Sequence, residues 1–180
     1  KKSRVNAAYT GSVAKVIIED GFTDSLILER NLTIADSLAV SAGVLFCGAN
    51  KLTVNGSVAQ YGGYFSASTD TTFLNGNVTL TGGTFQHNGG TVCFNPEVAI
   101  GLTVSRTINT ASKLTLTNVR FSGSIGAGSE NVNPEIVNFI LSSDTIVVNN
   151  DFSIGRSETG LDAININTGV IEPQDSIFCE

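Results

Sequence analysis

The sequence has no tryptophan, no methionine and a single histidine, His87. A lone histidine in a Gln-His-Asn-Gly-Gly stretch is typical of a solvated turn, because no second histidine or paired cysteine accompanies it for metal binding or catalysis. Carboxylates are also few. Glu19, Asp20 and Asp24 are near neighbours, but no pair recurs on one face with a basic partner, as polysaccharide cleavage requires. We therefore predict that the protein is not an enzyme and has no catalytic, cofactor or metal site.

Positive charge and long apolar runs are scarce as well. The chain has 10 Lys and Arg against 16 Asp and Glu, a formal net charge of −6. This balance disfavours nucleic acid or an anionic membrane as a partner. No apolar run approaches the ~20 residues of a membrane-spanning helix, so we expect no membrane insertion. Helix signals are nearly absent, whereas 19 glycines and many Thr, Val, Ile and Asn indicate an all-β chain.

The three cysteines are Cys47, Cys93 and Cys179. The interval between Cys47 and Cys93 is not a multiple of the repeat described next, so we do not expect their thiols to face each other. Cys93 lies between Val92 and Phe94 and should point outward if those two point inward. The odd number favours free or intermolecular thiols over an internal disulfide framework, and the spacing fits no metal motif.

The dominant feature is a repeat with a period of about 20 residues between Leu32 and Ser105, an interval typical of repeat proteins. In such proteins each unit buries its apolar face against its neighbours. The recurring positions are Leu32, Leu52, Thr72 and Val92; Ile34, Val54, Leu74 and Phe94; Leu38, Val58, Val78 and Val98; Val40, Gln60, Leu80 and Ile100; Leu45, Phe65 and Phe85; Gly43, Gly63 and Gly83; and Asn55, Asn75 and Asn95.

One repeat shows how we expect the chain to run. Residues 52–54, 58–60 and 64–65 have strand patterns, and Asn55-Gly56-Ser57 and Gly62-Gly63 supply the bends. Three short strands then form a coil of about 20 residues, whose strands pair with the next coil about 4.8 Å away. The asparagines would form an amide ladder. We predict a right-handed parallel β-helix, or β-solenoid. An antiparallel sandwich explains short strands but not one fixed interval.

The repeat also suggests the domain organisation. We expect residues 1–14 to form an N-terminal leader or cap, and residues 15–180 to form a single β-solenoid domain. Beyond the regular part, Val98, Ile100 and Val104 match Val119, Phe121 and Ile125, as if a single residue were inserted at a bend. We expect a loop insertion near residues 122–135. The chain starts Lys-Lys-Ser-Arg without Met, so we expect a processed or trimmed piece of a longer product.

The segments "NLTIADSLAVSAGVLFCGANKLTVNGSV" and "FLNGNVTLTGGTFQHNGGTVCF" carry a family resemblance. Their texture resembles the degenerate repeats of secreted bacterial β-solenoids, which include adhesins, filamentous-haemagglutinin-type proteins and autotransporter passengers. The resemblance covers roughly residues 15–125 and rests on the repeats, since no signature motif is present. It implies a pectate-lyase-like right-handed helix. The acidic and basic cluster of the polysaccharide-cleaving enzymes with this fold is missing from the sequence, and fold alone does not confer activity.

These observations favour a non-enzymatic extracellular or cell-surface protein, a rigid module of a bacterial adhesin or of a self-assembling fibre. We expect it to associate with itself or with neighbouring modules through open solenoid ends, with Cys179 available to another chain. One alternative is a protein that binds glycans, or cleaves polysaccharides, with Tyr61 and Tyr64 stacking on sugar rings. These tyrosines are equally suited to the solenoid wall. Another alternative is a segment of a phage fibre.

Overall fold

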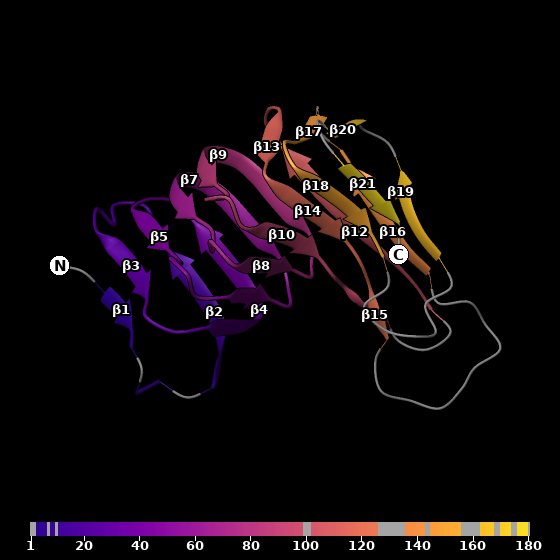
Figure 1. Ribbon diagram of the computed structural model, residues 1–180. Helices are drawn as coiled ribbons and strands as arrows, with labels where there is room; N and C mark the ends of the chain where they lie inside the picture. The colour runs from indigo at the N-terminus through magenta and orange to yellow at the C-terminus, as the bar shows by residue number, and fades with distance from the viewer. Residues whose placement is uncertain are drawn as a thin grey trace.

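The computed structural model describes residues 3–6, 8–9, 11–98, 102–125, 136–142, 145–155, 163–167, 170–173 and 176–179. In these residues the regular secondary structure is entirely β, and every paired strand is parallel to its neighbour. Successive coils follow one another along a single axis from the N-terminal strands to the C-terminal ones (Figure 1). The fold is therefore a parallel β-helix, as the repeat predicts.

Two long ladders of strands run the length of this coil. The first contains β4 (Leu32–Val40), β6 (Leu52–Val54), β8 (Thr71–Leu74), β10 (Thr91–Phe94), β14 (Asn118–Phe121), β18 (Asp151–Ile154) and β21 (Ser176–Cys179). The second contains β2 (Ser12–Ile18), the C-terminal part of β4, β7 (Val58–Ser66), β9 (Val78–Gln86), β12 (Thr103–Thr110), β16 (Ile136–Leu141) and β19 (Ala163–Asn167).

The third side of the coil is divided. Its first part contains β1 (Ser3–Val5), β3 (Ser25–Leu28), β5 (Val44–Phe46) and the C-terminal parts of β7 and β9. Its second part is a separate sheet of β13 (Leu114–Leu116), β17 (Thr145–Val148) and β20 (Val170–Pro173). A two-stranded sheet of β11 (Glu97–Val98) and β15 (Ser124–Ile125) lies outside these ladders.

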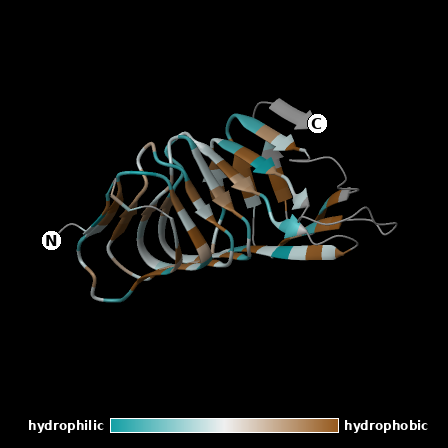
Figure 2. Ribbon diagram, turned by 90° about the horizontal axis from the view of Figure 1, so that it is seen from below, coloured by the Kyte–Doolittle hydropathy of each residue, from teal (hydrophilic) through white to brown (hydrophobic). Residues whose placement is uncertain are grey.

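The predicted register is confirmed in the regular part of the chain. Leu32 pairs with Leu52, Leu52 with Thr72, and Thr72 with Val92. Buried and more exposed residues alternate along β6 and β8, and hydrophobic and hydrophilic colours alternate along strands of the ribbon (Figure 2). The paired residues Leu32, Leu52, Thr72 and Val92 are each at most 2% exposed. The inward positions therefore form continuous core stripes, as expected when strands with a period of two stack in register.

Glycine is required at the corners because the coils approach each other backbone to backbone. Gly43, Gly63 and Gly83 have φ values of 57°, 64° and 72°, a left-handed conformation that other residues rarely adopt. A Cβ atom at Gly56 would lie 1.5 Å from the backbone oxygen of Asp36. The Gly62–Gly63 corner is a break in register within the single strand β7, so two of the three expected strands join into one bent strand.

The expected pairing beyond Phe94 is wrong. Val78 pairs with Ile108, so this coil is longer than those before it, and Val78 does not share its register with Val98. Val98 instead pairs with Ile125 in the small outer sheet, while Ile100 lies outside the described residues. Pro96 occupies the position of Gly56 and Gly76, and the chain after it leaves the wall before β12 returns to the second ladder.

The expected step from Val98 to Val119 is likewise wrong. Val119 pairs with Val92 on one side and with Phe152 on the other, and both steps along the chain are longer than the repeat. The core stays filled despite these irregular steps, because Phe121 stacks on Phe94 at a centroid distance of 5.1 Å and meets Phe139 edge-on at 4.9 Å. Aromatic pairs of this kind contribute beyond the area they bury.

Two segments were predicted to be additions to the regular solenoid, residues 1–14 and the loop near residues 122–135. The described part of residues 1–14 contains β1, which pairs with β3, and the start of β2, which pairs with β4. It therefore belongs to the first coil. The loop expected near residues 122–135 begins with β15, which pairs with β11. Residues 126–135 lie outside the described residues.

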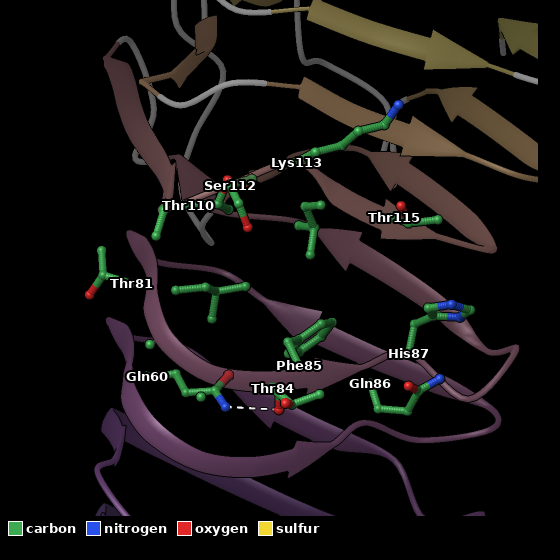
Figure 3. Close-up of a pocket in the computed structure, with 15 residues that line it drawn as sticks. Gln60, Thr81, Thr84, Phe85, Gln86, His87, Thr110, Ser112, Lys113 and Thr115 are labelled. Carbon is green, nitrogen blue, oxygen red and sulfur yellow. Dashed lines mark hydrogen bonds between the residues drawn. The ribbon is translucent and has the colours of Figure 1, made fainter.

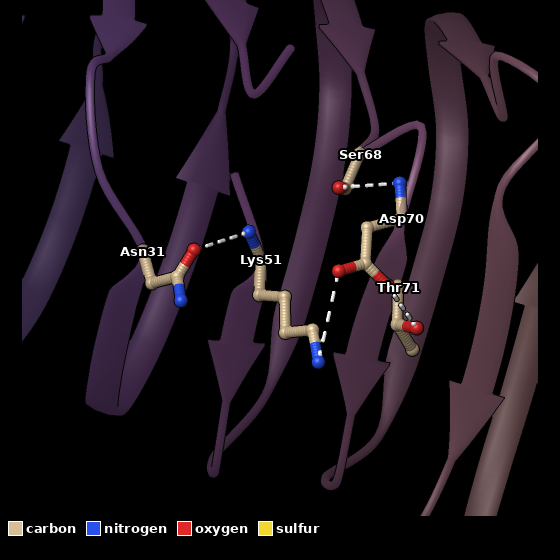
Figure 4. Close-up of polar contacts among 5 residues, drawn as sticks. All are labelled: Asn31, Lys51, Ser68, Asp70 and Thr71. Atoms are coloured by element: carbon tan, nitrogen blue, oxygen red, sulfur yellow. Dashed lines mark hydrogen bonds and ion pairs between the residues drawn. The ribbon is translucent and has the colours of Figure 1, made fainter. Parts of the chain in front are cut away.

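Polar side chains connect neighbouring coils on the outer surface (Figure 4). Asn31 Oδ1 accepts a hydrogen bond of 2.9 Å from the backbone nitrogen of Lys51. Lys51 Nζ lies 3.6 Å from Asp70 Oδ2 in the following coil. Both side chains of this ion pair are about half exposed, at 47% and 50%. Exposed pairs contribute little to stability, so the coil is held mainly by its backbone ladders and core stripes.

Candidate functional site

The candidate site is a cleft in the wall of the solenoid, where the third side of the coil is divided. Among the strands that the structure describes, the C-terminal part of β9 pairs only with β7, and β13 is the terminal strand of its own sheet. A cleft of about 400 Å³ lies between them. Figure 3 shows its lining, with Thr84 and Phe85 on the β9 side and Lys113 and Thr115 on the β13 side.

The cleft has two defined ends. At one end the backbone nitrogen of Ala111 donates a hydrogen bond of 3.0 Å to the carbonyl oxygen of Leu80. At the other end Thr117 Oγ1 and His87 Nδ1 are 2.8 Å apart. Between these two closures, residues 81–86 face residues 112–116 without a connecting ladder. The opening arises because the bulged corner at Gly82–Gly83 has no counterpart in the next coil.

The alternation of hydrogen bonds shows which backbone groups face the cleft. Ala67 N donates to Gln86 O at 2.8 Å, so Gln86 is bonded toward β7, and the adjacent residue Phe85 directs its N–H and C=O to the opposite edge. On the other wall, Asn149 N donates to Leu116 O at 2.9 Å. Leu116 is therefore bonded toward β17, and Thr115 directs its N–H and C=O toward the cleft.

Gln60 adds a buried polar group to this lining. Its side chain is 0% exposed and stands in a position that is apolar in the neighbouring coils, where Val40 and Leu80 occur. Its Nε2 donates to Thr84 O at 2.9 Å, while its Oε1 has no hydrogen-bond partner. A buried polar atom without a partner costs roughly 1–3 kcal/mol. The amide oxygen is thus a buried acceptor without a hydrogen-bond partner, on a residue that lines the cleft.

His87 was expected in a solvated turn, but it is partly buried, lies just before the turn at Asn88 and Gly89, and closes one end of the cleft. Its Nδ1 accepts a hydrogen bond of 3.1 Å from Gly89 N in addition to its contact with Thr117. Partial burial lowers the pKa of the imidazole below its usual value, so the ring is neutral near pH 7. The described residues contain no group of three or more His, Cys, Asp or Glu that could hold a metal ion. The cleft therefore offers hydroxyl, amide and backbone groups to a ligand.

The two cysteines whose side chains the structure describes are both free and buried. Burial raises the pKa of Cys47 to about 12. Cys93 is aligned with Phe73 and Arg120 on the outer side of the wall and yet is only 4% exposed. Burial raises its pKa to about 11, against the opposing charge of Arg120. Of Cys179, the structure describes the backbone pairing with Ile154.

The two tyrosines considered for sugar stacking are on the surface one coil before the cleft. Tyr61 is 61% exposed and Tyr64 is 38% exposed. Tyr61 pairs with Gly82 and Tyr64 with Thr84, and both of these partners line the cleft. The tyrosine rings themselves do not line it. The sequence identified the tyrosines by their aromatic character, whereas the cleft results from missing strand pairing and leaves no motif.

At each end of the solenoid, some of the described strands have a described neighbour on one side only. At the N-terminal end these are β1 and β2, and at the C-terminal end β19, β20 and β21. Ser41 N donates to Ile18 O at 2.8 Å. Because Ile18 is bonded toward β4, Ile17 directs its N–H and C=O to the open edge. The Ile17 side chain is 59% exposed.

Comparisons with protein-family models, with curated proteins and with solved structures found no match to this chain. The described part of the chain contains no helix long and apolar enough to cross a membrane. The class of protein that the fold defines is a parallel β-helix repeat protein.

Proposed function

We propose that this chain is a non-enzymatic, extracellular structural module. It is a rigid β-solenoid segment of a bacterial surface adhesin or of a self-assembling fibre. It joins neighbouring protein through its ends. The observation that carries this proposal is the pairing of β1 and β2 on one side only, at the end of ladders that continue to β21. Open strand edges template further pairing unless they are covered. Parallel pairing with another chain continues the same ladder.

Two further features support this role. The core stripes and ladders make each coil depend on its neighbours, which gives a stiff rod suited to a spacer. Buried thiols are inert, so the free Cys47 and Cys93 are compatible with the oxidising conditions outside a cell. The contact between Thr117 and His87 has no carboxylate in the cleft lining to orient the imidazole as a general base, which supports a role in binding or assembly over catalysis.

The test is the association state of the purified chain and of the variant Ile17→Pro. Proline removes the N–H that Ile17 directs to the open edge but leaves the bonds of Ile18 to β4. We expect the unmodified chain to form end-to-end multimers in sedimentation and electron microscopy as its concentration rises. We expect Ile17→Pro to remain monomeric with an unchanged melting temperature.

Ile17→Val is the matched control, because it keeps the N–H and an apolar β-branched side chain; it should associate as the unmodified chain does. A strictly monomeric unmodified chain, with slow amide exchange in β2 and β21, would contradict the proposal. A screen of acidic and neutral polysaccharides tests the absence of catalysis. Reproducible turnover that a single carboxylate substitution abolishes would overturn it.

A further inference from the structure

We propose that the cleft between β9 and β13 is a strand-insertion site, which takes a short extended peptide as an additional rung of the third ladder. The proposal concerns the wall of the solenoid and is independent of association through its ends. It rests on two facing strand edges, a defined opening and a buried acceptor without a partner.

The backbone groups of the two walls match an extended peptide. Phe85 presents an N–H and a C=O from one wall, and Thr115 presents the same pair from the other, as derived above. An extended peptide has donors and acceptors that alternate between its two sides, so one strand can bond both walls at once. The two closures limit the paired stretch to residues 81–86 on β9. At about 3.3 Å per residue, this stretch accommodates at most about six residues.

The inward-facing side of the cleft is apolar on both walls. Phe85 and Leu114 both pack against the hydrophobic core, one on each side of the cleft. Side chains alternate between the faces of a strand, so a bound peptide places one residue between these two and its neighbours outward. The outer lining of Thr84, Gln86 and Thr115 is polar. A peptide with one inward-pointing residue between two outward-pointing polar residues therefore fits the cleft.

A buried polar group beside this apolar position favours threonine as the central residue of the peptide. Gln60 lines the cleft and is fully buried, and its Oε1 has no hydrogen-bond partner. Threonine has a methyl group that matches Phe85 and Leu114, and a hydroxyl donor that matches the amide oxygen of Gln60. The favoured ligand is thus an extended segment in which one threonine points inward between polar residues.

An oligosaccharide is the competing ligand and fits the lining less well. A sugar ring that stacks needs an exposed aromatic face, but the aromatic ring in this cleft, Phe85, meets Phe65 edge-on at 5.0 Å and packs against the core. Carboxylates, which accept several sugar hydroxyls, are not among the described residues that line the cleft. The alternating donors and acceptors of two strand edges match a peptide backbone more closely.

The experiment uses the whole chain and a fluorescent heptapeptide, acetyl-Gly-Ser-Gln-Thr-Gln-Ser-Gly-amide, whose five central residues occupy the cleft while its two terminal glycines lie outside the paired stretch. Binding is measured by fluorescence anisotropy and by the backbone amide signals of Phe85 and Thr115 in nuclear magnetic resonance spectra. We expect saturable binding that shifts both signals. A peptide N-methylated at the residue after the central threonine lacks the donor to Phe85 O. Its affinity should be lower by about tenfold or more, which is the effect of one lost hydrogen bond together with a blocked approach.

Controls separate backbone pairing from other contacts. The same peptide N-methylated at its first glycine, outside the paired stretch, should bind as the parent does. In the protein, Thr115→Pro removes an N–H that faces the cleft and leaves the β17 ladder intact, so binding should fall by about tenfold or more. Ile17→Pro removes a strand-edge N–H that is remote from the cleft lining, and should bind within about twofold of the unmodified chain.

Some outcomes would overturn the proposal. Equal affinity for the parent and the centrally N-methylated peptides would exclude backbone pairing, and this comparison needs no protein variant to fold. An absence of shifts at Phe85 and Thr115 would place the peptide elsewhere. Shifts of these two signals by a chito- or malto-oligosaccharide series, with none by the heptapeptide, would assign the cleft to glycans.

Discussion

Asn75 Nδ2 donates a hydrogen bond of 3.1 Å to Asn55 Oδ1, one coil earlier. The expected amide ladder is therefore present between these two asparagines. It does not continue to Asn95, because Asn75 Oδ1 and Asn95 Oδ1 both lack partners. Pro96 follows Asn95 directly, and the register of β8 with β10 ends at Cys93. The Asn-Gly bend that aligns Asn55 with Asn75 is therefore replaced by Asn95-Pro96, and the ladder ends there.

Asn75→Ala should lower the free energy of unfolding by about 1 kcal/mol, the usual contribution of one side-chain hydrogen bond. Asn95→Ala should lower it by less, since the Asn95 amide oxygen has no partner to lose. Urea unfolding of both variants checks this difference. Equal losses would show that the bond to Asn55 contributes nothing.

Val78→Asp should unfold the solenoid. Val78 is 1% exposed between Val58 and Ile108, and a carboxylate buried there without a partner costs several kcal/mol. Thr79→Asp, at the neighbouring outward position, should cost about 0.5 kcal/mol or less. Melting temperatures from circular dichroism measure both. A similar loss in the two variants would contradict the inward and outward assignment.

Gly56→Ala should cost about 3 kcal/mol, because its Cβ would collide with the backbone of the preceding coil and the coils must separate. The Cβ would lie 1.5 Å from the Asp36 oxygen. Gly89→Ala is the matched control, because Gly89 has a φ of 82° but no atom within 4 Å of the added Cβ. Backbone strain alone should cost about 1–2 kcal/mol there. Chemical unfolding of the two variants separates close contact from strain.

Stability should fall as the pH rises above about 9. Burial raises the pKa of Cys47 to about 12 and that of Cys93 to about 11, whereas both thiols ionise near pH 8.5 when the chain is unfolded. The unfolded chain therefore loses protons first, and each thiol lowers the free energy of unfolding by up to about 1.4 kcal/mol per pH unit between pH 9 and 11.

Urea unfolding at pH 7.5, 9 and 10 measures this slope. A variant with Cys47→Ala and Cys93→Ala should show a flatter profile, and the difference between the two profiles removes the contribution of lysines and tyrosines. Both native thiols should also react slowly with a thiol reagent at pH 8. A slope that is the same with and without the cysteines would show that the two thiols are not protected in the folded state.

The sequence predicted the regular part of the solenoid because two constraints acted together there. Apolar residues such as Leu52 and Val54 had to return in register, and corner glycines such as Gly63 had to fit against the coil before. After Phe94 only the first constraint remained, and Val98 was chemically as suitable a partner for Val78 as Ile108. Periodicity alone does not show where a coil lengthens. Pro96, in place of a corner glycine, was the available signal.

The cleft could not be predicted for a related reason. It arises where Gly82–Gly83 forms a bulged corner and the following coil does not, so two strands that should pair diverge. No residue pattern marks an absence of pairing. Gln60 was the visible sign, as an amide in the core column that is otherwise apolar. Its residue type alone does not show that a cleft lies beside it.

The corner glycines fix the length of each coil in the regular part of this chain. A Cβ at Gly62 would lie 2.2 Å from Ser41 O, and one at Gly82 would lie 2.1 Å from Tyr61 O. The backbone of each corner is therefore in close contact with the backbone of the corner in the preceding coil. An addition of a few residues cannot be absorbed at such a corner. Length can change only by a whole coil, and each coil gained or lost moves the two ends by about 4.8 Å.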